Sequence, residues 1–379
     1  MNNEERILEE IIQNKELMLD SIKKVVQHKS VYDAKTVNEK YPYGKNINDC
    51  LEYVLELGKN LGFEIENVNN QFGIIKYNPQ KLVTKDYIGI VGHLDVVPEG
   101  DGWNFPPFGA VEDNNKIYGR GILDNKGPII TCLFALYAIK ELNIELDYPI
   151  WIMFGTNEET GFNDVVELLK HKNPPLMGFT PDCKYPVVYA ERGRCEYNIK
   201  TKIENIKIFN QFINEYFLSS DSHANKLGLN IKDPEFGMME LRNQKLIGNE
   251  ENLIFSFSLS YPKSITNEEI KKQIISKMPD CLELKLVKNY DPVFFEKDGI
   301  LCKKLQKAYE KITNNDGTPV TTTGGTYAKM IPNIVPFGPS FPEQKGIAHN
   351  PDEWMDINDI MTNTKIYGLA IYYLGSKND

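Results

Sequence analysis

The sequence predicts an α/β fold with a largely parallel sheet, into which a small α+β domain is inserted. Apolar, strand-like runs alternate with segments of helical periodicity through the first half of the chain, and this pattern resumes after Pro292. Between residues 192 and 292 the order changes to strand, helix, strand, helix and strand, with room for one extra strand. We therefore expect a larger domain, formed by residues 1–191 and 293–379, and an inserted domain of residues 192–292.

Helices of the larger domain are predicted from apolar residues three and four positions apart. In residues 3–28, for example, Ile7, Ile11 and Ile22 fall on one helical face. Gly62 marks the end of a second helix, because glycine favours the position after a helix end. The expected helices are residues 3–28, 46–61, 126–142, 163–171, 299–312 and 357–374.

Strands are predicted from short apolar runs that polar or turn-forming residues bound. In the larger domain these runs are residues 63–68, 72–78, 86–95 and 148–157, and a new segment begins at 186–193. The inserted domain is expected to contain strands at 195–203, 253–262 and 281–289 and helices at 206–218 and 266–278.

Charge and composition exclude several classes of protein. Lys and Arg total 43 against 53 Asp and Glu, a formal net charge of −10, which argues against nucleic acid or an anionic membrane as a partner. No uncharged apolar run approaches the ~18–20 residues that span a bilayer, and the N-terminus lacks the features of a signal peptide. The six cysteines are scattered without a C-x-x-C pair, so we expect reduced thiols in a soluble cytoplasmic protein.

Polar residues with chemical potential follow the predicted strands. His93 ends an apolar run, and Asp95, two residues later, points to the same side of an extended chain. An imidazole that binds a metal usually donates its other N–H to a carboxylate. Asp124 stands in a glycine-bracketed turn before a helix, where the alternative is a helix N-cap.

Two further segments carry carboxylates, and a late segment offers a histidine. Glu158 and Glu159 end a buried strand. Of two neighbouring carboxylates, one can bind a metal while the other transfers a proton, although an acidic helix start is the alternative. Asp182 lies in a Pro-flanked loop, where an ordinary turn aspartate is the alternative. With His349, these residues form the mixed His, Asp and Glu set that divalent metals such as zinc prefer.

The order of these segments resembles the co-catalytic zinc metallopeptidase family of acetylornithine deacetylase, succinyl-diaminopimelate desuccinylase and carnosinase. The matching motifs are G-H-x-D-V-V-P, G-R-G-x-x-D-x-K-G, E-E-x-G, a later Pro-Asp, G-G-T-Y-A and A-H-x-P-D-E. The stretches most similar to the PepV-like (Xaa-His) dipeptidases are Trp103–Phe108, Gly119–Pro128, Gly324–Ala328 and Ala348–Trp354. The resemblance implies a zinc-peptidase-like catalytic domain of three layers and a ferredoxin-like lid.

The resemblance also implies roles for individual residues. The residues that match ligands of two divalent metal ions are His93, Asp124, Glu159, Asp182 and His349. Asp124 matches the bridging carboxylate, followed by a cis peptide bond to Asn125. Glu158 matches the general base, and Asp95 the carboxylate that orients His93.

The inserted domain departs from the PepV pattern because it is shorter than the lids of those enzymes. Family members with short lids usually dimerise through them, so we expect a homodimer. Candidate substrate contacts are His223, Arg242, Gly324, Gly325 and Thr326. His223 lacks the proline of the family's A-H-x-x-P string, and an ordinary loop residue is the alternative. Ser260 stands where the family often has an arginine.

We therefore expect a hydrolase that cleaves the amide bonds of dipeptides or small peptides with two zinc ions, cobalt or manganese being alternatives. A deacylase of N-acyl amino acids with the same site is the first alternative. A metal-binding protein with reduced or lost catalysis is the second, because the lid is short.

Overall fold

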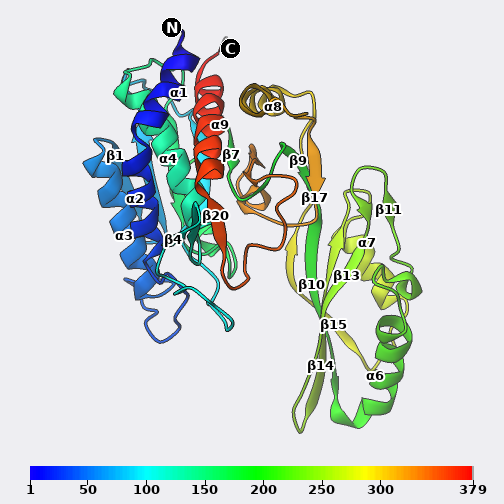
Figure 1. Ribbon diagram of the computed structural model, residues 1–379. Coiled ribbons are helices and arrows are strands. Elements are labelled where there is room, and N and C mark those ends of the chain that lie inside the picture. Colours follow the sequence, from blue (N-terminus) through cyan, green and yellow to red (C-terminus); the bar gives the residue numbers. More distant parts are fainter. Residues whose placement is uncertain (378–379) are drawn as a thin grey trace. The chain divides into compact units, whose positions relative to one another are not determined.

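A mixed sheet and a separate antiparallel sheet organise the computed structural model, which describes residues 1–377. The chain divides into two units (Figure 1). Unit 1 contains residues 1–188, 296–319 and 326–377, and unit 2 contains residues 189–295 and 320–325. Both units combine helices with strands, so the predicted α/β class is confirmed. The role of the inserted segment as a lid stays a prediction.

The six-stranded sheet of unit 1 is mostly parallel on one side and antiparallel on the other. Its strands in spatial order are β1 (Glu64–Val68), β2 (Phe72–Tyr77), β6 (Ile150–Gly155), β3 (Ile88–His93), β7 (Met177–Thr180) and β18 (Ile334–Pro336). β3 pairs in parallel with β6 and β7, and β18 in parallel with β7. Every residue of β3 is buried, because both faces of the sheet are covered there.

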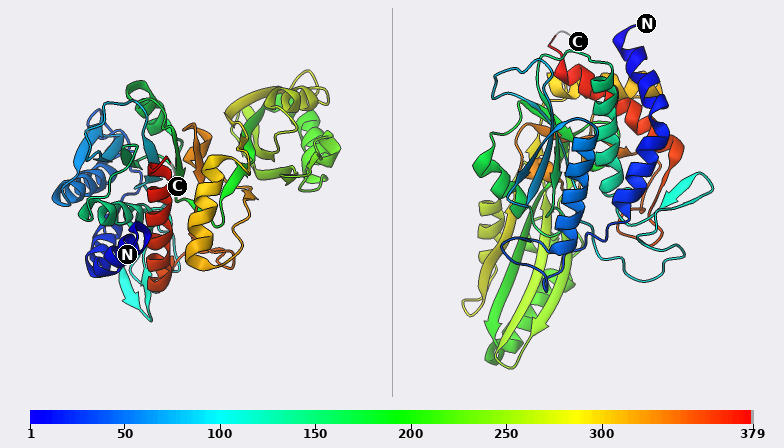
Figure 2. Two further views of the ribbon diagram at one scale, coloured as in Figure 1. Left: turned by 90° about the horizontal axis from the view of Figure 1, so that it is seen from above. Right: turned by 90° about the vertical axis from the view of Figure 1, so that its left-hand side faces the viewer.

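Helices α4 and α9 pack against each other and against β3 in unit 1. α1 packs on both helices and α2 on α4 (Figures 1 and 2). The helices of this unit are α1 (Asn3–Gln13), α2 (Lys15–Val26), α3 (Lys45–Asn60), α4 (Lys126–Glu141), α5 (Asn163–His171), α8 (Ile300–Thr313) and α9 (Ile357–Gly375). No helix within residues 1–377 combines the length and the apolar character that crossing a bilayer requires.

The single helix predicted over residues 3–28 is wrong, because α1 and α2 are separate. The break falls at Asn14, whose backbone leaves the helical region and whose side-chain amide donates to the Glu10 carbonyl at 2.9 Å. That local bond competes with the helical hydrogen bonds of the backbone.

Unit 2 contains a ferredoxin-like arrangement. Its sheet has the order β13-β14-β10-β15 and is entirely antiparallel. The elements in chain order are β10 (Gly193–Lys202), α6 (Ile206–Ile213), β13 (Glu240–Gly248), β14 (Asn252–Tyr261), α7 (Asn267–Ile275) and β15 (Glu283–Tyr290). Chain order βαββαβ and this strand order are those of the ferredoxin-like fold. Cys195, Tyr197 and Ile199 alternate with more exposed residues and face the core of the unit.

Short elements complete the chain. The remaining strands are β4 (Val111–Asp113), β5 (Lys116–Tyr118), β8 (Cys183–Lys184), β9 (Val188–Glu191), β11 (Lys232–Asp233), β12 (Gly237–Met238), β16 (Val293–Phe294), β17 (Val320–Thr322), β19 (Pro339–Ser340) and β20 (Trp354–Asp356). The short helices are η1 (Ile203–Asn205), η2 (Asn214–Leu218), η3 (Asn225–Leu227) and η4 (Tyr327–Lys329). η2 continues α6 as a π-helical turn over the last part of the helix predicted at 206–218.

The close approach of β3 and β7 predicts the effect of one substitution. A Cβ atom at Gly178 would lie 1.8 Å from the carbonyl oxygen of Gly89 on β3. We expect Gly178→Ala to lower the free energy of unfolding by about 1–3 kcal/mol, because the two backbones must separate. Denaturant titration measures this loss. In the control Gly248→Ala, the new Cβ atom would lie 3.1 Å from the Leu253 side chain and 3.7 Å from the Asn252 carbonyl oxygen, an ordinary contact distance. Equal stability of Gly178→Ala and the unmodified protein would contradict the prediction.

Candidate metal and catalytic site

The carboxyl ends of three neighbouring strands bring the predicted site residues together. β3 ends at His93, β6 ends at Gly155 shortly before Glu158 and Glu159, and β7 ends at Thr180 shortly before Asp182. β3 is parallel to both neighbours, so all three ends lie at one edge of the sheet, where open α/β sheets bind ligands.

Five of the predicted residues form two overlapping groups with ligand atoms within 4.8 Å of one another. One group is His93, Asp124 and Glu159, and the other is His93, Glu158 and Asp182. His93 Nε2 lies 3.1 Å from Asp124 Oδ1 and 3.7 Å from Asp182 Oδ2. The histidine is completely buried, so its ring is fixed between these carboxylates.

His349 joins the same cluster from the loop before β20. Its Nε2 lies 2.9 Å from Asp124 Oδ2 and 3.1 Å from Glu159 Oε1. The Asp124 carboxylate therefore stands between two imidazoles, with one oxygen toward His93 and the other toward His349. The peptide bond from Asp124 to Asn125 is cis, in agreement with the family pattern.

Asp95 contacts the cluster in a way that the sequence did not predict. His93 Nδ1 lies 2.8 Å from the backbone carbonyl of Asp95 and 3.5 Å from its carboxylate. The carboxylate oxygens instead accept the backbone N–H groups of Glu158 and Glu159, each at 3.1 Å. Asp95 thus holds the turn that presents both glutamates, and its carbonyl is the nearer partner of the imidazole.

Burial and mutual repulsion shift the pKa values of the clustered carboxyls. Burial, and then the charge of Asp182, raises the pKa of Glu158 well above its usual range. Burial and the charge of Asp124 raise the pKa of Asp182 to about 7. Burial also opposes the charge on Asp124, but hydrogen bonds with His349 and His93 hold the pKa of this carboxyl well below its usual value. Carboxylates this close repel one another, and a cation among them relieves that repulsion.

The donor set fits divalent metal ions. Imidazole nitrogens and carboxylate oxygens are the ligands that zinc takes in catalytic sites. Hydrogen bonds with Asp124 and Glu159 raise the pKa of His349 to about 11. Its Nε2 faces both carboxylates, which is the position that a metal ligand would need.

Three more polar residues hold the cluster, and the sequence motifs gave partial signals for two of them. Asn125 donates to the Pro181 carbonyl at 2.6 Å and accepts from the backbone of His93 at 3.3 Å. Glu353, at the end of the A-H-N-P-D-E-W string, accepts the backbone N–H of Asp124 at 3.1 Å. Asp164 accepts backbone N–H groups of the turn before Glu158, and no motif indicated it.

The predicted substrate contacts lie mostly in unit 2, and their roles stay predictions. His223 Nδ1 donates to the Met239 carbonyl at 3.0 Å. The Arg242 guanidinium pairs with Glu240, which also accepts from Arg192 at 2.8 Å. Gly324 and Gly325 belong to unit 2, whereas Thr326 belongs to unit 1 and accepts from the backbone of Ala328 at 3.2 Å.

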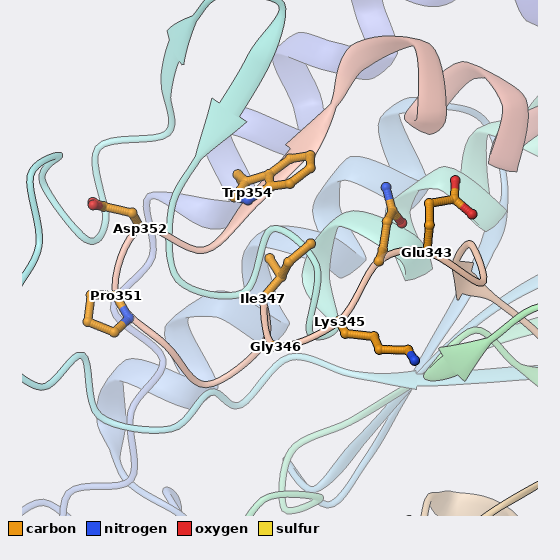
Figure 3. A pocket seen from close by; sticks show the side chains of 8 residues that line it. Glu343, Lys345, Gly346, Ile347, Pro351, Asp352 and Trp354 are labelled. Carbon is orange, nitrogen blue, oxygen red and sulfur yellow. The ribbon is translucent and has the colours of Figure 1, made fainter.

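A pocket of about 480 Å³ lies on the loop that carries His349. Figure 3 shows the side chains that line it. The lining residues are Glu343, Gln344, Lys345, Gly346, Ile347, Pro351, Asp352 and Trp354. None of the clustered carboxylates is among the residues that line this pocket.

Comparison with known proteins identifies the family. The model of "Peptidase family M20/M25/M40" matches residues 89–373. "Putative dipeptidase YtjP" of Bacillus subtilis is 26% identical over 463 positions that cover 96% of this chain and 98% of that protein. A relative from Staphylococcus saprophyticus, "Putative dipeptidase SSP1012", is 24% identical over 95% of this chain and 97% of its own. Both alignments have more positions than this chain has residues, so these relatives contain segments without a counterpart here.

Solved structures show the same fold at low sequence identity. The dipeptidase Dug1p from Saccharomyces cerevisiae aligns with a TM-score of 0.77 and 14% identity, covering 100% of this chain and 99% of that one. Human carnosine dipeptidase 1 aligns with a TM-score of 0.73 and 13% identity, covering 99% of each chain. The predicted resemblance is confirmed: the chain belongs to peptidase family M20/M25/M40 and is a peptidase of that family.

Proposed function

We propose that this protein is a dinuclear metal-dependent dipeptidase in which Glu158 acts as general base. One observation carries the proposal: Asp124 lies between the imidazoles of His93 and His349, and the paired glutamates close the same cluster. Membership of a peptidase family and relatives named as dipeptidases support the choice of peptide substrates.

The residues divide into two ligand sets that share Asp124. His93 and Asp182 would complete the first set, and Glu159 and His349 the second, because each pair lies on its own side of the Asp124 carboxylate. Two divalent cations, zinc being the best match to these donors, would supply Lewis-acid polarisation of the scissile carbonyl and of water.

Glu158 is the group best placed to move a proton. Its pKa is raised by burial and by Asp182, which makes its carboxylate a stronger base than an exposed glutamate. As the water oxygen bonds to the amide carbon, Glu158 takes the water proton, and it returns that proton to the amine nitrogen as the C–N bond breaks. The Asp95 carboxylate fixes the position of Glu158 because it accepts the backbone N–H of Glu158.

The predicted substrate contacts remain part of the proposal. His223 of unit 2 offers its Nε2 because Nδ1 is engaged with Met239. Gly324, Gly325 and Thr326 are the proposed substrate-cradling turn. Arg242 is the proposed partner of a substrate carboxylate, which would compete with Glu240 for the guanidinium.

The six free cysteines support a reducing, cytoplasmic location.

Replacing the proposed base should separate catalysis from metal binding. We expect Glu158→Gln to lower kcat on dipeptides by about 10²- to 10⁴-fold, because the amide cannot take a proton. Elemental analysis should find the same metal content as in the unmodified protein. Glu9→Gln, an exposed change on α1, is the control. Loss of metal together with activity would instead make Glu158 a ligand, and full activity would exclude it as the base.

Substrate class is tested on the zinc-loaded protein. We expect release of free amino acids from dipeptides at a higher kcat/KM than from N-acetyl or N-succinyl amino acids, and loss of this activity after exhaustive chelation. Liquid chromatography of the products measures both. Hydrolysis of the acylated amino acids alone would contradict the dipeptidase proposal, and activity that survives chelation would contradict the metal site.

Asp164 predicts how the stability of the metal-free protein depends on pH. Burial raises the pKa of this carboxyl to about 6 from an ordinary 3.8, so between these values the folded protein binds more protons than the unfolded chain. Stability therefore falls as the pH rises from about 4 to about 6, by about 3 kcal/mol at most from this group. We expect Tm to decline less steeply with pH in Asp164→Asn. Identical slopes in the two proteins would contradict the prediction.

A homodimer formed through unit 2 is the proposed assembly. Leu246 and Ile247 are 61% and 45% exposed on β13, an edge strand that can pair with another chain. Light scattering should give twice the chain mass of 43.4 kDa, and Ile247→Lys should give the single mass. Ile12→Lys, at an exposed position of α1, is the control. A monomer at micromolar concentration would exclude the dimer.

A further inference from the structure

Glu353 is a completely buried carboxylate with every oxygen engaged. Its Oε1 accepts the backbone N–H groups of Gly121, Leu123 and Asp124 at 3.0, 2.9 and 3.1 Å. Its Oε2 accepts from the Arg120 guanidinium at 2.8 Å. Four N–H donors converge on one side chain, and three of them come from the turn that ends in Asp124.

The backbone of the His349 loop is tied to the same turn at two more points. The carbonyl of Glu353 accepts the N–H of Gly119 at 2.9 Å. The Arg120 guanidinium also donates to the carbonyl of Asn350 at 3.3 Å. Arg120 is only 1% exposed, so these bonds are shielded from water. Residues 119–124 and 350–353 are therefore held in a fixed register.

That register determines where two metal-binding groups meet. His349 lies four residues before Glu353, and its imidazole lies 2.9 Å from the Asp124 carboxylate. The Glu353–Arg120 clamp joins the same two segments at the opposite end. A shift of one segment along the other would change the separation between His349 and Asp124 directly.

The His349 loop needs such a clamp because its own conformation is unfavourable. His349 and Asp352 have φ values of +62° and +54°, in the left-handed region that side chains disfavour. The pocket of about 480 Å³ shown in Figure 3 opens beside this loop. The hydrogen bonds of Glu353 and Arg120 hold the loop on the side of the Asp124 turn.

We propose that Glu353, held by Arg120, is a positioning residue that sets the spacing of His349 and Asp124 and thereby the affinity of one of the two metal positions. This inference rests on the proposed dinuclear site. It assigns a selective effect, because His349 belongs to only one of the two positions that share Asp124. The position of Asp124, Glu159 and His349 depends on the clamp for the placement of His349, whereas the position of Asp124, His93 and Asp182 is also held by Asn125 and the strand ends.

The test is calorimetric titration of the metal-free full chain with Co²⁺, followed by the visible absorption of the bound ion. We expect two ions in the unmodified protein. In Glu353→Gln one carboxylate oxygen becomes an amide N–H₂ group, which cannot accept the N–H donors of the Asp124 turn or of Arg120. One of the two ions should therefore bind about 10- to 100-fold more weakly, and its visible absorption should change. Arg120→Lys, which keeps the charge and loses the fork, should weaken the same ion by a smaller factor.

Asp233→Asn is the matched control. Asp233 is another buried carboxylate that accepts two backbone N–H groups, from Glu235 and Phe236, and it belongs to unit 2. We expect this variant to bind both ions as the unmodified protein does, even where its Tm is lower.

Each outcome decides the inference. Two ions of unchanged affinity in Glu353→Gln would overturn it and leave the proposed function intact. Equal weakening of both ions would also overturn it, because the role would then be general stability. Failure of the unmodified protein to bind two ions would overturn the proposed function itself. If circular dichroism shows that Glu353→Gln does not fold, the affinities of the two ions in Arg120→Lys decide the inference by the same criteria.

Discussion

Repulsion among carboxylates is the constraint on which the site depends. Asp124 lies within 4.8 Å of Glu159, and Glu158 within 4.8 Å of Asp182, in two groups that share His93. The pKa values of Glu158, Glu159 and Asp182 are raised. Burial makes each charge costlier, because little water remains to screen it. The fold must hold these groups in place by other contacts, and only a bound cation turns their proximity into attraction.

Neutral donors from the backbone do most of this holding. Asp95 accepts the N–H groups of Glu158 and Glu159, Asp164 accepts those before them, and Glu353 accepts three from the Asp124 turn. Backbone N–H groups cannot swing away, as long side chains can. The turns that carry the clustered carboxylates are therefore held by bonds that do not depend on the rotamer of a donor side chain.

Much of this arrangement could be predicted from the sequence, and the reasons are specific. His93, Glu159 and Asp182 follow apolar strands, and parallel strands bring their carboxyl ends to one edge. The break at Asn14 escaped prediction because apolar spacing continues on both sides of it, so that periodicity alone shows one helix. Asp164 escaped because a lone aspartate at a helix start has an ordinary explanation, and its bond with Tyr327 joins segments that are distant in the sequence.

The choice of donors also decides how much charge remains for a metal. A lysine or arginine bonded directly to Asp124 or Glu159 would hold it in place, but would neutralise the charge that attracts the cation. Arg120 instead reaches the Asp124 turn through Glu353, so that its positive charge is balanced by a carboxylate outside the ligand set. The clamp is close to neutral as a pair, so Arg120 does not neutralise the proposed ligand carboxylates. A site that must bind divalent cations therefore gains most from supports that fix geometry without supplying charge of their own.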